Sequence, residues 1–200
     1  MPVDVIIGAQ WGDEGKGRYT DLLAEATDGV ARFSGGDNAG HTVTVGSSVF
    51  KLHLMPSGII HHGKLAVLGN GMVINPAHLL QEMDGLAERG VDVSPERVKI
   101  SHAAHLITPM HIALDKANES ARGESKIGTT LRGIGPAYTD KIARKGLRLE
   151  SFLDPEGLAD MIDAHVAQGN VQLTQLFGAA PLNAAAIASE YYQYAERLRP

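Results

Sequence analysis

The residues best suited to chemistry lie in a glycine-rich stretch near the amino terminus, from Gly8 to Gly17. Glycines let backbone N–H groups turn toward an anion without steric clash, and a following helix adds the positive end of its dipole. Lys16 supplies the mobile cation that a triphosphate requires. Asp13 and Glu14 lie in the same stretch, where a carboxylate beside phosphate is costly unless it holds a metal or moves a proton. We therefore expect this first loop to bind phosphate and to take part in catalysis.

The first loop departs from the usual phosphate-binding pattern G-x-x-x-x-G-K-[ST] at two points. Six residues rather than four separate Gly8 from Gly15, and Gly17 stands where a magnesium-binding hydroxyl is expected. The alternative is a glycine-rich turn with solvated charges. The expected strand–loop–helix context and Lys16 favour the phosphate-binding interpretation, and the acidic pair adds the expectation of catalysis.

Two further glycine-rich stretches carry polar side chains. In residues 34–42, small residues allow a ligand to touch the backbone, and Asn38, His41 and Thr42 are available for recognition. Residues 128–138 combine hydroxyls, an arginine and three glycines, which suits an anion. The basic run that follows is either a solvated charged face or part of the same anion site; its members are Lys141, Arg144, Lys145 and Arg148.

Composition is that of a soluble globular chain: 200 residues, 44% hydrophobic and 20% charged. A net charge of −5 gives no sign of a nucleic-acid or membrane surface. The chain has no cysteine, which excludes disulfides and thiolate metal ligands. It shows neither an apolar stretch of membrane-spanning length nor a signal peptide, so we expect a cytoplasmic protein with no membrane or nucleic-acid partner.

Hydrophobic spacing predicts strands and helices in alternation around these loops. The expected strands are Val3–Ile7, Gly29–Phe33, Leu65–Leu68, Met72–Ile74 and Arg97–Ile100, with a hairpin formed by Thr42–Val45 and Val49–Leu54. The expected helices are Arg18–Ala26 (buried through Leu22, Leu23 and Ala26), Asn75–Gly90, Pro109–Ala121, Asp154–Gly169 and 181–199. Such alternation predicts an α/β fold with a mainly parallel central sheet, flanking helices and a phosphate-loop-like nucleotide site beyond the strands' carboxyl ends. We expect residues 1–200 to be the N-terminal portion of one larger domain, without an internal boundary.

Histidines and tyrosines away from the loops give weaker signals. His61, His62, His102 and His105 suggest metal binding only superficially, because no carboxylates accompany them in helical register. We expect them to be surface or packing residues. The tyrosines at 191, 192 and 194 are expected to pack rather than to stack on a ligand.

Together the loops resemble the adenylosuccinate synthetase family over essentially all 200 residues. The segments that carry the resemblance are Gln10–Gly17, Asn38–Thr42, Pro56–Gly58, Gly128–Thr130 and Arg132–Tyr138. The resemblance implies a ligase of purine biosynthesis that joins IMP and L-aspartate into adenylosuccinate, through 6-phosphoryl-IMP, with GTP as co-substrate. It also implies one Mg²⁺ per subunit and a homodimer.

The resemblance further assigns roles to individual residues. Asp13 takes the N1 proton of IMP, His41 acts as acid or hydrogen-bond donor at the phosphates, and Mg²⁺ is held by Asp13 and the Gly40 carbonyl. Arg144 reaches the IMP of a neighbouring subunit. The implied IMP-binding residues are Asp13, Glu14, Gly15, Lys16, Asn38, Ala39, Gly40, His41, Thr130 and Arg144. The implied GTP-binding residues are Gly12, Asp13, Glu14, Gly15, Lys16, Gly17, Arg18, Gly40, His41 and Thr42.

Three departures from the family pattern accompany this resemblance. Asp37 stands where relatives often carry histidine, which adds negative charge near IMP, and Leu131 replaces a common glycine. The chain is about half the family's usual length and has no Asn-Lys-x-Asp guanine motif.

Other functions are weighed against the synthetase. A viral branch of the family acts on a guanine nucleotide and is expected to carry serine at position 13, so Asp13 favours IMP. A non-catalytic phosphate-binding fragment is a second alternative. A regulatory GTPase-like switch would need a hydroxyl residue after Lys16 and a guanine motif, and the sequence has neither.

Overall fold

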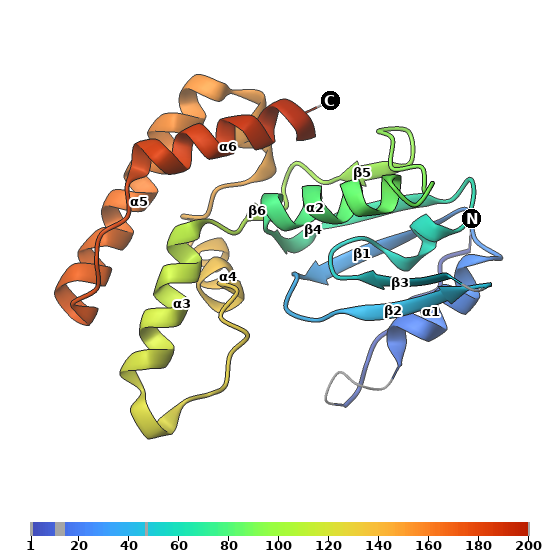
Figure 1. Ribbon diagram of the computed structural model, residues 1–200, viewed down its shortest axis with the longest axis horizontal. Helices are drawn as coiled ribbons and strands as arrows, with labels where there is room; N and C mark the ends of the chain where they lie inside the picture. Colours follow the sequence, from blue (N-terminus) through green and yellow to red (C-terminus); the bar gives the residue numbers. More distant parts are fainter. Residues whose placement is uncertain (1, 11–14, 47, 200) are drawn as a thin grey trace.

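The computed structural model describes residues 2–10, 15–46 and 48–199, and it places a sheet layer beside a helical layer (Figure 1). The described strands of the main sheet are all parallel, in the order β1-β4-β5, and β6 pairs with the carboxyl end of β4. A separate antiparallel hairpin joins β2 and β3. The strands are β1 (Gly29–Gly35), β2 (His41–Val45), β3 (Ser48–Leu52), β4 (Leu65–Ile74), β5 (Val98–Ile100) and β6 (His105–Leu106). The expected parallel sheet and hairpin are confirmed.

Helices flank the sheet and make up the second layer. They are α1 (Lys16–Ala24), α2 (Pro76–Ala87), α3 (Pro109–Ala121), α4 (Ile134–Ile142), α5 (Pro155–Phe177) and α6 (Ala184–Leu198), with short 3₁₀ turns η1 (Ser57–Ile60), η2 (Gly123–Ser125) and η3 (Leu149–Leu153). Three begin where a polar side chain caps the first turn and proline follows, namely at Asn75, Thr108 and Asp154. This local chemistry explains why the sequence predicts the bounds of α3 correctly.

The expected strand at Val3–Ile7 is wrong for this structure. Residues 2–8 have no strand conformation, and the side chains of Val3, Val5 and Ile7 are 81%, 72% and 73% exposed. A strand requires a neighbouring strand to take up its backbone hydrogen bonds, and none of the described strands runs beside this segment.

The inward face of α1 also differs from the expected one. Leu22 is 66% exposed and Ala26 is exposed, whereas Ala24 is buried. The helix packs on β2 and η1, and this direction of approach turns Ala24 rather than Leu22 toward the core.

Strand β4 was expected as two short strands separated by Gly69–Gly71, but it runs unbroken through them. The glycines permit this continuation because a side chain at Gly71 would collide with the Phe33 carbonyl of β1. The register between β1 and β4 shifts at this point, between Arg32 and Ser34. The glycines therefore mark a close approach of two strands and a bulge, not a turn.

Two helices differ from their predicted extent. Helix α5 continues past Gly169 to Phe177 and ends at Gly178, which is left-handed with φ 61°. Gly169 does not end the helix: it lies inside α5, where Met110 of α3 packs so closely that a Cβ would collide with it. Helix α4 was not predicted: the third loop ends at Gly133, and residues 134–138 already form the start of α4.

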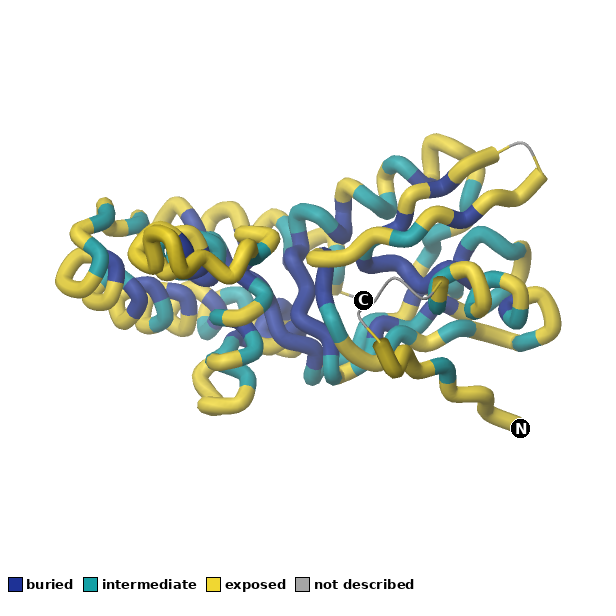
Figure 2. The backbone as a smooth tube through the Cα atoms, turned by 90° about the horizontal axis from the view of Figure 1, so that it is seen from below, coloured by how far each residue is buried: buried dark blue, intermediate teal, exposed yellow. Residues whose placement is uncertain are grey.

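The buried apolar residues form one large cluster in the sheet layer, a second among the helices α3, α5 and α6, and a small third one made of Val73, Ile107 and Ala137. Figure 2 shows the buried backbone running through the middle of the molecule. Tyr191 of α6 is buried and packs edge-on against Phe152, with ring centroids 6.3 Å apart, which confirms its packing role; Tyr192 is 47% exposed. Within the described residues, no helix has both the length and the apolar character needed to cross a bilayer.

Candidate nucleotide site

The first and second loops meet at the start of α1. Gly15 caps this helix in a left-handed conformation with φ 83°, and Lys16 opens the helix. A side chain at Gly8 would collide with Lys16, and one at Gly17 would lie 2.7 Å from the Cβ of His41. The helix start that carries Lys16 is therefore packed against His41. Gly12, Asp13 and Glu14 lie outside the described residues, so their roles stay predictions.

Arg32 of β1 fixes the backbone of the second loop from inside. Its guanidinium donates to the carbonyl of His53, to that of Gly36 at 2.5 Å and to that of Ser34 at 3.3 Å. Tyr138 of α4 adds a second tie, because its hydroxyl accepts from the Gly35 N–H at 2.7 Å and donates to the Gly71 carbonyl at 2.9 Å. Arg32 has no sequence signal beyond being a lone arginine in a strand, and Tyr138 is predicted only as the last residue of the third loop, without this role.

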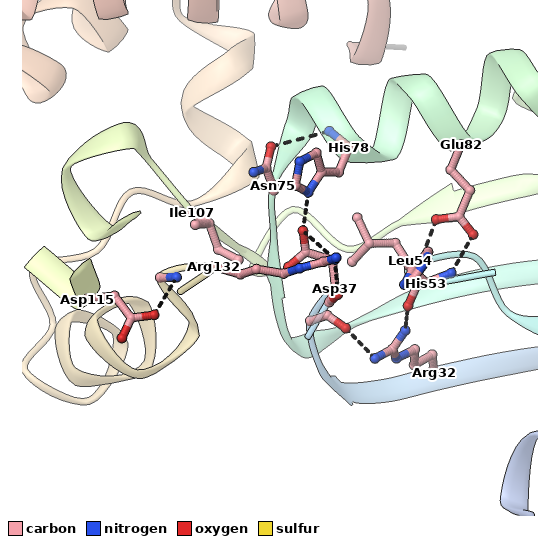
Figure 3. A network of polar contacts seen from close by, with 12 residues as sticks. Arg32, Asp37, His53, Leu54, Asn75, His78, Glu82, Ile107, Asp115 and Arg132 are labelled. Carbon is pink, nitrogen blue, oxygen red and sulfur yellow. Dashed lines mark hydrogen bonds and ion pairs between the residues drawn. The ribbon is translucent and has the colours of Figure 1, made fainter. Parts of the chain in front are cut away.

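Asp37 joins the second loop to the third loop and to α2. Its carboxylate is fully buried and contacts the imidazole of His78, while Arg132 donates to the Asp37 carbonyl at 2.5 Å and lies 3.8 Å from the carboxylate (Figure 3). The expectation that Asp37 adds negative charge near IMP stays a prediction; in this structure its carboxylate is buried rather than exposed at the loop surface. Arg132 supplies a positive charge beside this buried carboxylate, and the His78 ring is its hydrogen-bond partner.

The surface of the second loop is open to a ligand. Asn38, Ala39 and Gly40 are exposed, while the ring of His53 lies against Gly40, where a Cβ would be 2.7 Å from Cε1. Glu82 of α2 anchors this histidine from behind, accepting from the backbone N–H groups of residues 53 and 54 at 2.8 Å each (Figure 3). The sequence analysis did not identify Glu82 either.

His41 begins β2 and is half-buried beside these loops. Burial lowers the pKa of His41 below its ordinary value, and the positive charge of Arg32 and the nearby His53 lower it further. The imidazole is thus neutral at pH 7, a form that donates a hydrogen bond through one nitrogen. Two further residues predicted to contact GTP, Arg18 and Thr42, are exposed to solvent.

The third loop presents Thr130 to solvent and connects back to the second loop through Arg132. Leu131 lies in the left-handed region with φ 55°, which is unusual for a residue with a branched side chain. A glycine would adopt this conformation without the steric cost that a Cβ brings.

Arg144 does not join the three loops. It is exposed beyond the carboxyl end of α4, also in a left-handed conformation with φ 59°. The other members of the basic run point to different places: Lys141 donates to the Asn70 carbonyl at 2.6 Å, and Arg148 pairs with Glu150 at 3.3 Å. The run is therefore not one anion site.

Among the described residues, the one set with metal-ligand spacing is His111, Asp140 and His165, whose ligand atoms lie within 4.8 Å of one another. The Thr108 N–H donates to Nδ1 of His111 at 2.9 Å, so the proton of this neutral ring is on Nε2 and faces Asp140 at 3.2 Å. A nitrogen that carries a proton cannot bind a metal. The set is a hydrogen-bonded cluster between α3, α4 and α5. The four histidines first considered for metal binding are not part of it: His61, for example, pairs with Asp21.

The fold and loops define a class: an α/β protein in which a glycine-rich loop follows the carboxyl end of the parallel strand β1 and lies beside the start of α1, an arrangement in which nucleotides bind. The family model for adenylosuccinate synthetase matches residues 5–200. The chain belongs to the adenylosuccinate synthetase family.

Individual relatives agree with this assignment. The adenylosuccinate synthetase of Moorella thermoacetica is 54% identical over 200 residues, and that of Syntrophobacter fumaroxidans is 50% identical over 196 residues. These alignments cover 100% and 98% of this chain and 46% of each relative. The chain thus spans about half the length of the curated relatives it matches.

Solved structures give the same result. The structure of fully ligated adenylosuccinate synthetase from Plasmodium falciparum matches with a TM-score of 0.84 and 35% identity, covering 96% of this chain and 44% of that chain. Cyanophage S-2L succinoaminodeoxyadenylate synthetase, bound to dGMP and to dATP as an energy donor, matches with a TM-score of 0.55 and 26% identity over 72% of this chain and 40% of that chain.

Proposed function

We propose that the protein containing this chain ligates IMP and L-aspartate to adenylosuccinate, using GTP and releasing GDP and phosphate, in the cytoplasm. Family membership supports the reaction class. The observation that carries the proposal is the packing of Gly17 against His41, because it puts the cation-bearing helix start of the first loop beside the histidine of the second.

In this proposal two chemical steps share one site. Asp13 accepts the N1 proton of IMP, so that O6 attacks the γ-phosphorus of GTP while the bond to the β-phosphate oxygen breaks. The amine of aspartate then attacks C6, and phosphate leaves with the former O6. Lys16 and the N–H of neutral His41 stabilise the charge that develops on the transferred phosphoryl group.

Mg²⁺ is the cofactor in this proposal, with Asp13 and the Gly40 carbonyl as its protein ligands. Gly40 is exposed and offers a carbonyl oxygen, a donor type that Mg²⁺ accepts, so the described part of the site suits this ion. When bound, Mg²⁺ neutralises charge on the phosphates. This arrangement also explains why a glycine rather than a hydroxyl residue follows Lys16.

IMP binding in this proposal uses Asn38 at the inosine and Thr130 at the 5′-phosphate, with Arg144 reaching the IMP of the other subunit in a homodimer. The exposure of Asn38 and Thr130 supports direct contact with a ligand. The exposure of Arg144 just beyond the end of α4 supports a role in trans, because its side chain is accessible to another subunit.

A guanine nucleotide as acceptor is the second candidate, because of the similarity to the cyanophage synthetase. The test measures phosphate release by the protein as its gene encodes it, with GTP, L-aspartate and either IMP or dGMP. We expect turnover with IMP only. Turnover with dGMP but not with IMP would favour the second candidate. A protein that neither turns over nor binds IMP or dGMP would contradict the proposal.

His41→Asn tests the observation that carries the proposal. An amide cannot reproduce the imidazole at the transferred phosphoryl group, so kcat should fall by about 10²-fold or more while the Kd for IMP changes little. His62→Asn, at an exposed site, is the matched control. Loss of IMP affinity with kcat unchanged would make His41 a binding residue only.

A further inference from the structure

The segment from residue 123 to residue 133, which includes the first part of the third loop, is held largely by polar contacts. Every residue from Gly123 to Gly128 is exposed, and a cavity of about 440 Å³ lies under the loop, lined by residues of α3, α4 and α5 together with Ile127 and Thr129. Residues 123–128 contribute no buried apolar side chain; Ile127 is 66% exposed. Other interactions must therefore determine where Thr130 lies.

Two carboxylates one turn apart on α3 supply these interactions. Asp115 accepts from the Gly133 N–H at 2.9 Å through one oxygen and from the Thr129 hydroxyl at 3.1 Å through the other. Glu119 accepts from the Gly128 N–H at 2.5 Å. Both acids are only 7% exposed, so water competes little for these bonds.

The contacts hold both sides of the segment that carries Thr130. Gly128 and Thr129 lie just before it, and Gly133 follows it closely. Gly133 also touches the backbone of α3, since a Cβ there would be 2.9 Å from the carbonyl carbon of His111 (Figure 3 shows Asp115 directed at this part of the loop). The left-handed residue between the two attachment points, Leu131, then has little freedom to move.

We propose that Asp115 and Glu119 are positioning residues that clamp the third loop so that Thr130 meets the substrate phosphate. Negative charge is poorly suited to binding a phosphate directly. Here Asp115 faces one N–H and one O–H group of the loop and Glu119 faces one N–H group, so each carboxylate acts on the ligand only through the loop. The identity of the anion, the 5′-phosphate of IMP, rests on the proposed function; the clamp itself does not.

Isosteric and truncating variants distinguish whether the hydrogen bonds of these two side chains or their negative charges hold the loop. In Asp115→Asn, one amide atom still accepts from Gly133 and the other still pairs with the Thr129 hydroxyl; in Glu119→Gln, the carbonyl still accepts from Gly128. Asp115→Ala and Glu119→Ala lose these bonds. Glu124→Ala, which removes an exposed acid from the same loop, is the matched control.

The protein as its gene encodes it is examined by two measurements. Hydrogen exchange of the Gly128 and Gly133 amides reports on the clamp whatever the activity, and calorimetric titration with IMP reports on phosphate binding. In the alanine variants we expect faster exchange and a Kd for IMP about 10- to 100-fold higher, with kcat at saturating IMP within about threefold of wild type. The Asn, Gln and Glu124→Ala variants should resemble wild type.

Unchanged exchange and unchanged IMP affinity in both alanine variants would overturn the proposal, as would amide variants as weak as the alanine ones. Faster exchange with unchanged affinity would also overturn it, since the loop would then be clamped without consequence for phosphate. If Asp115→Ala does not fold, the comparison of Glu119→Ala with Glu119→Gln tests the proposal. A wild-type protein that fails to bind IMP would contradict the proposed function. Hydrogen exchange of the Gly128 and Gly133 amides would still test whether Asp115 and Glu119 hold the loop.

Discussion

At position 13 a carboxylate lies within a loop whose other features suit phosphate. A carboxylate beside phosphate is favourable only if it accepts a proton or binds a metal ion. An amide of the same shape cannot accept the proton. The chemistry proposed for the protein therefore depends on the carboxylate of Asp13.

Asp13→Asn should lower kcat by about two to four orders of magnitude, because the amide can hydrogen-bond but cannot accept the N1 proton. The check is the rate of adenylosuccinate formation at saturating substrates, with the urea unfolding midpoint measured alongside. That midpoint should not change. A variant that keeps more than about a tenth of the wild-type rate would show that Asp13 is not the base.

Leu131→Gly should stabilise the fold. A left-handed conformation costs a residue with a Cβ about 1–2 kcal/mol, and the greater freedom of glycine in the unfolded chain offsets about 0.5–1 kcal/mol of the relief. The net gain in the free energy of unfolding, measured by urea titration, is about 0.5–1 kcal/mol. Leu131→Ala keeps the Cβ and serves as control; an equal gain there would show that backbone strain is not the cause.

At the scale of elements, the junction between α3, α4 and α5 contains buried titratable groups. His111 and Asp140 form a hydrogen bond, which lowers the pKa of Asp140. His165 of α5 contacts the Thr108 hydroxyl at 2.8 Å, and burial, with the nearby His111, lowers the pKa of His165 to about 4. The native fold thus holds His165 in its neutral form.

This junction predicts a loss of stability in mild acid. The unfolded chain protonates His165 near its ordinary value of 6.5, whereas the folded protein does so only near pH 4, so stability falls as the pH drops through this window. The contribution is about 3 kcal/mol at most. Between pH 7 and 4.5, urea midpoints of His165→Gln should fall less steeply than those of wild type. His62→Gln, at an exposed histidine, should follow wild type; the same slope in both variants would contradict the assignment.

At the scale of the whole molecule, the position of Arg144 bears on assembly. Arg144 follows the carboxyl end of α4, where it is exposed and left-handed. An arginine offers a planar fork that grips phosphate at two points, so a contact with the IMP of another subunit would be strong.

Mixing two inactive variants tests this contact. If Arg144 acts in trans, Arg144→Leu and Asp13→Ala subunits, each inactive as homodimers, should regain about a quarter of wild-type activity when equal amounts exchange freely, because each hybrid holds one intact site. A tag on one variant confirms that hybrids form. Arg148→Leu, in the same basic run, is the matched control and should be active by itself. Hybrids that form and stay inactive would show that Arg144 acts within its own subunit or not at all.

The sequence by itself determined the local features. The caps and prolines at Asn75, Thr108 and Asp154 specify helix starts through contacts within one turn, so these starts are predictable. The glycine-rich loops and the family to which they belong were likewise identified from residue types in order along the chain.

Only the tertiary structure decided which residues fix the site. Arg32, Asp115 and Tyr138 act on backbone groups distant in sequence or on the far side of a turn, and no local pattern encodes such partners. The same holds for Gly71, whose role depends on how closely β1 approaches, and for the segment at residues 3–7, whose apolar pattern becomes a strand only beside a partner. Long-range backbone pairing and close packing depend on the path of the whole chain, which the spacing of neighbouring residues does not specify.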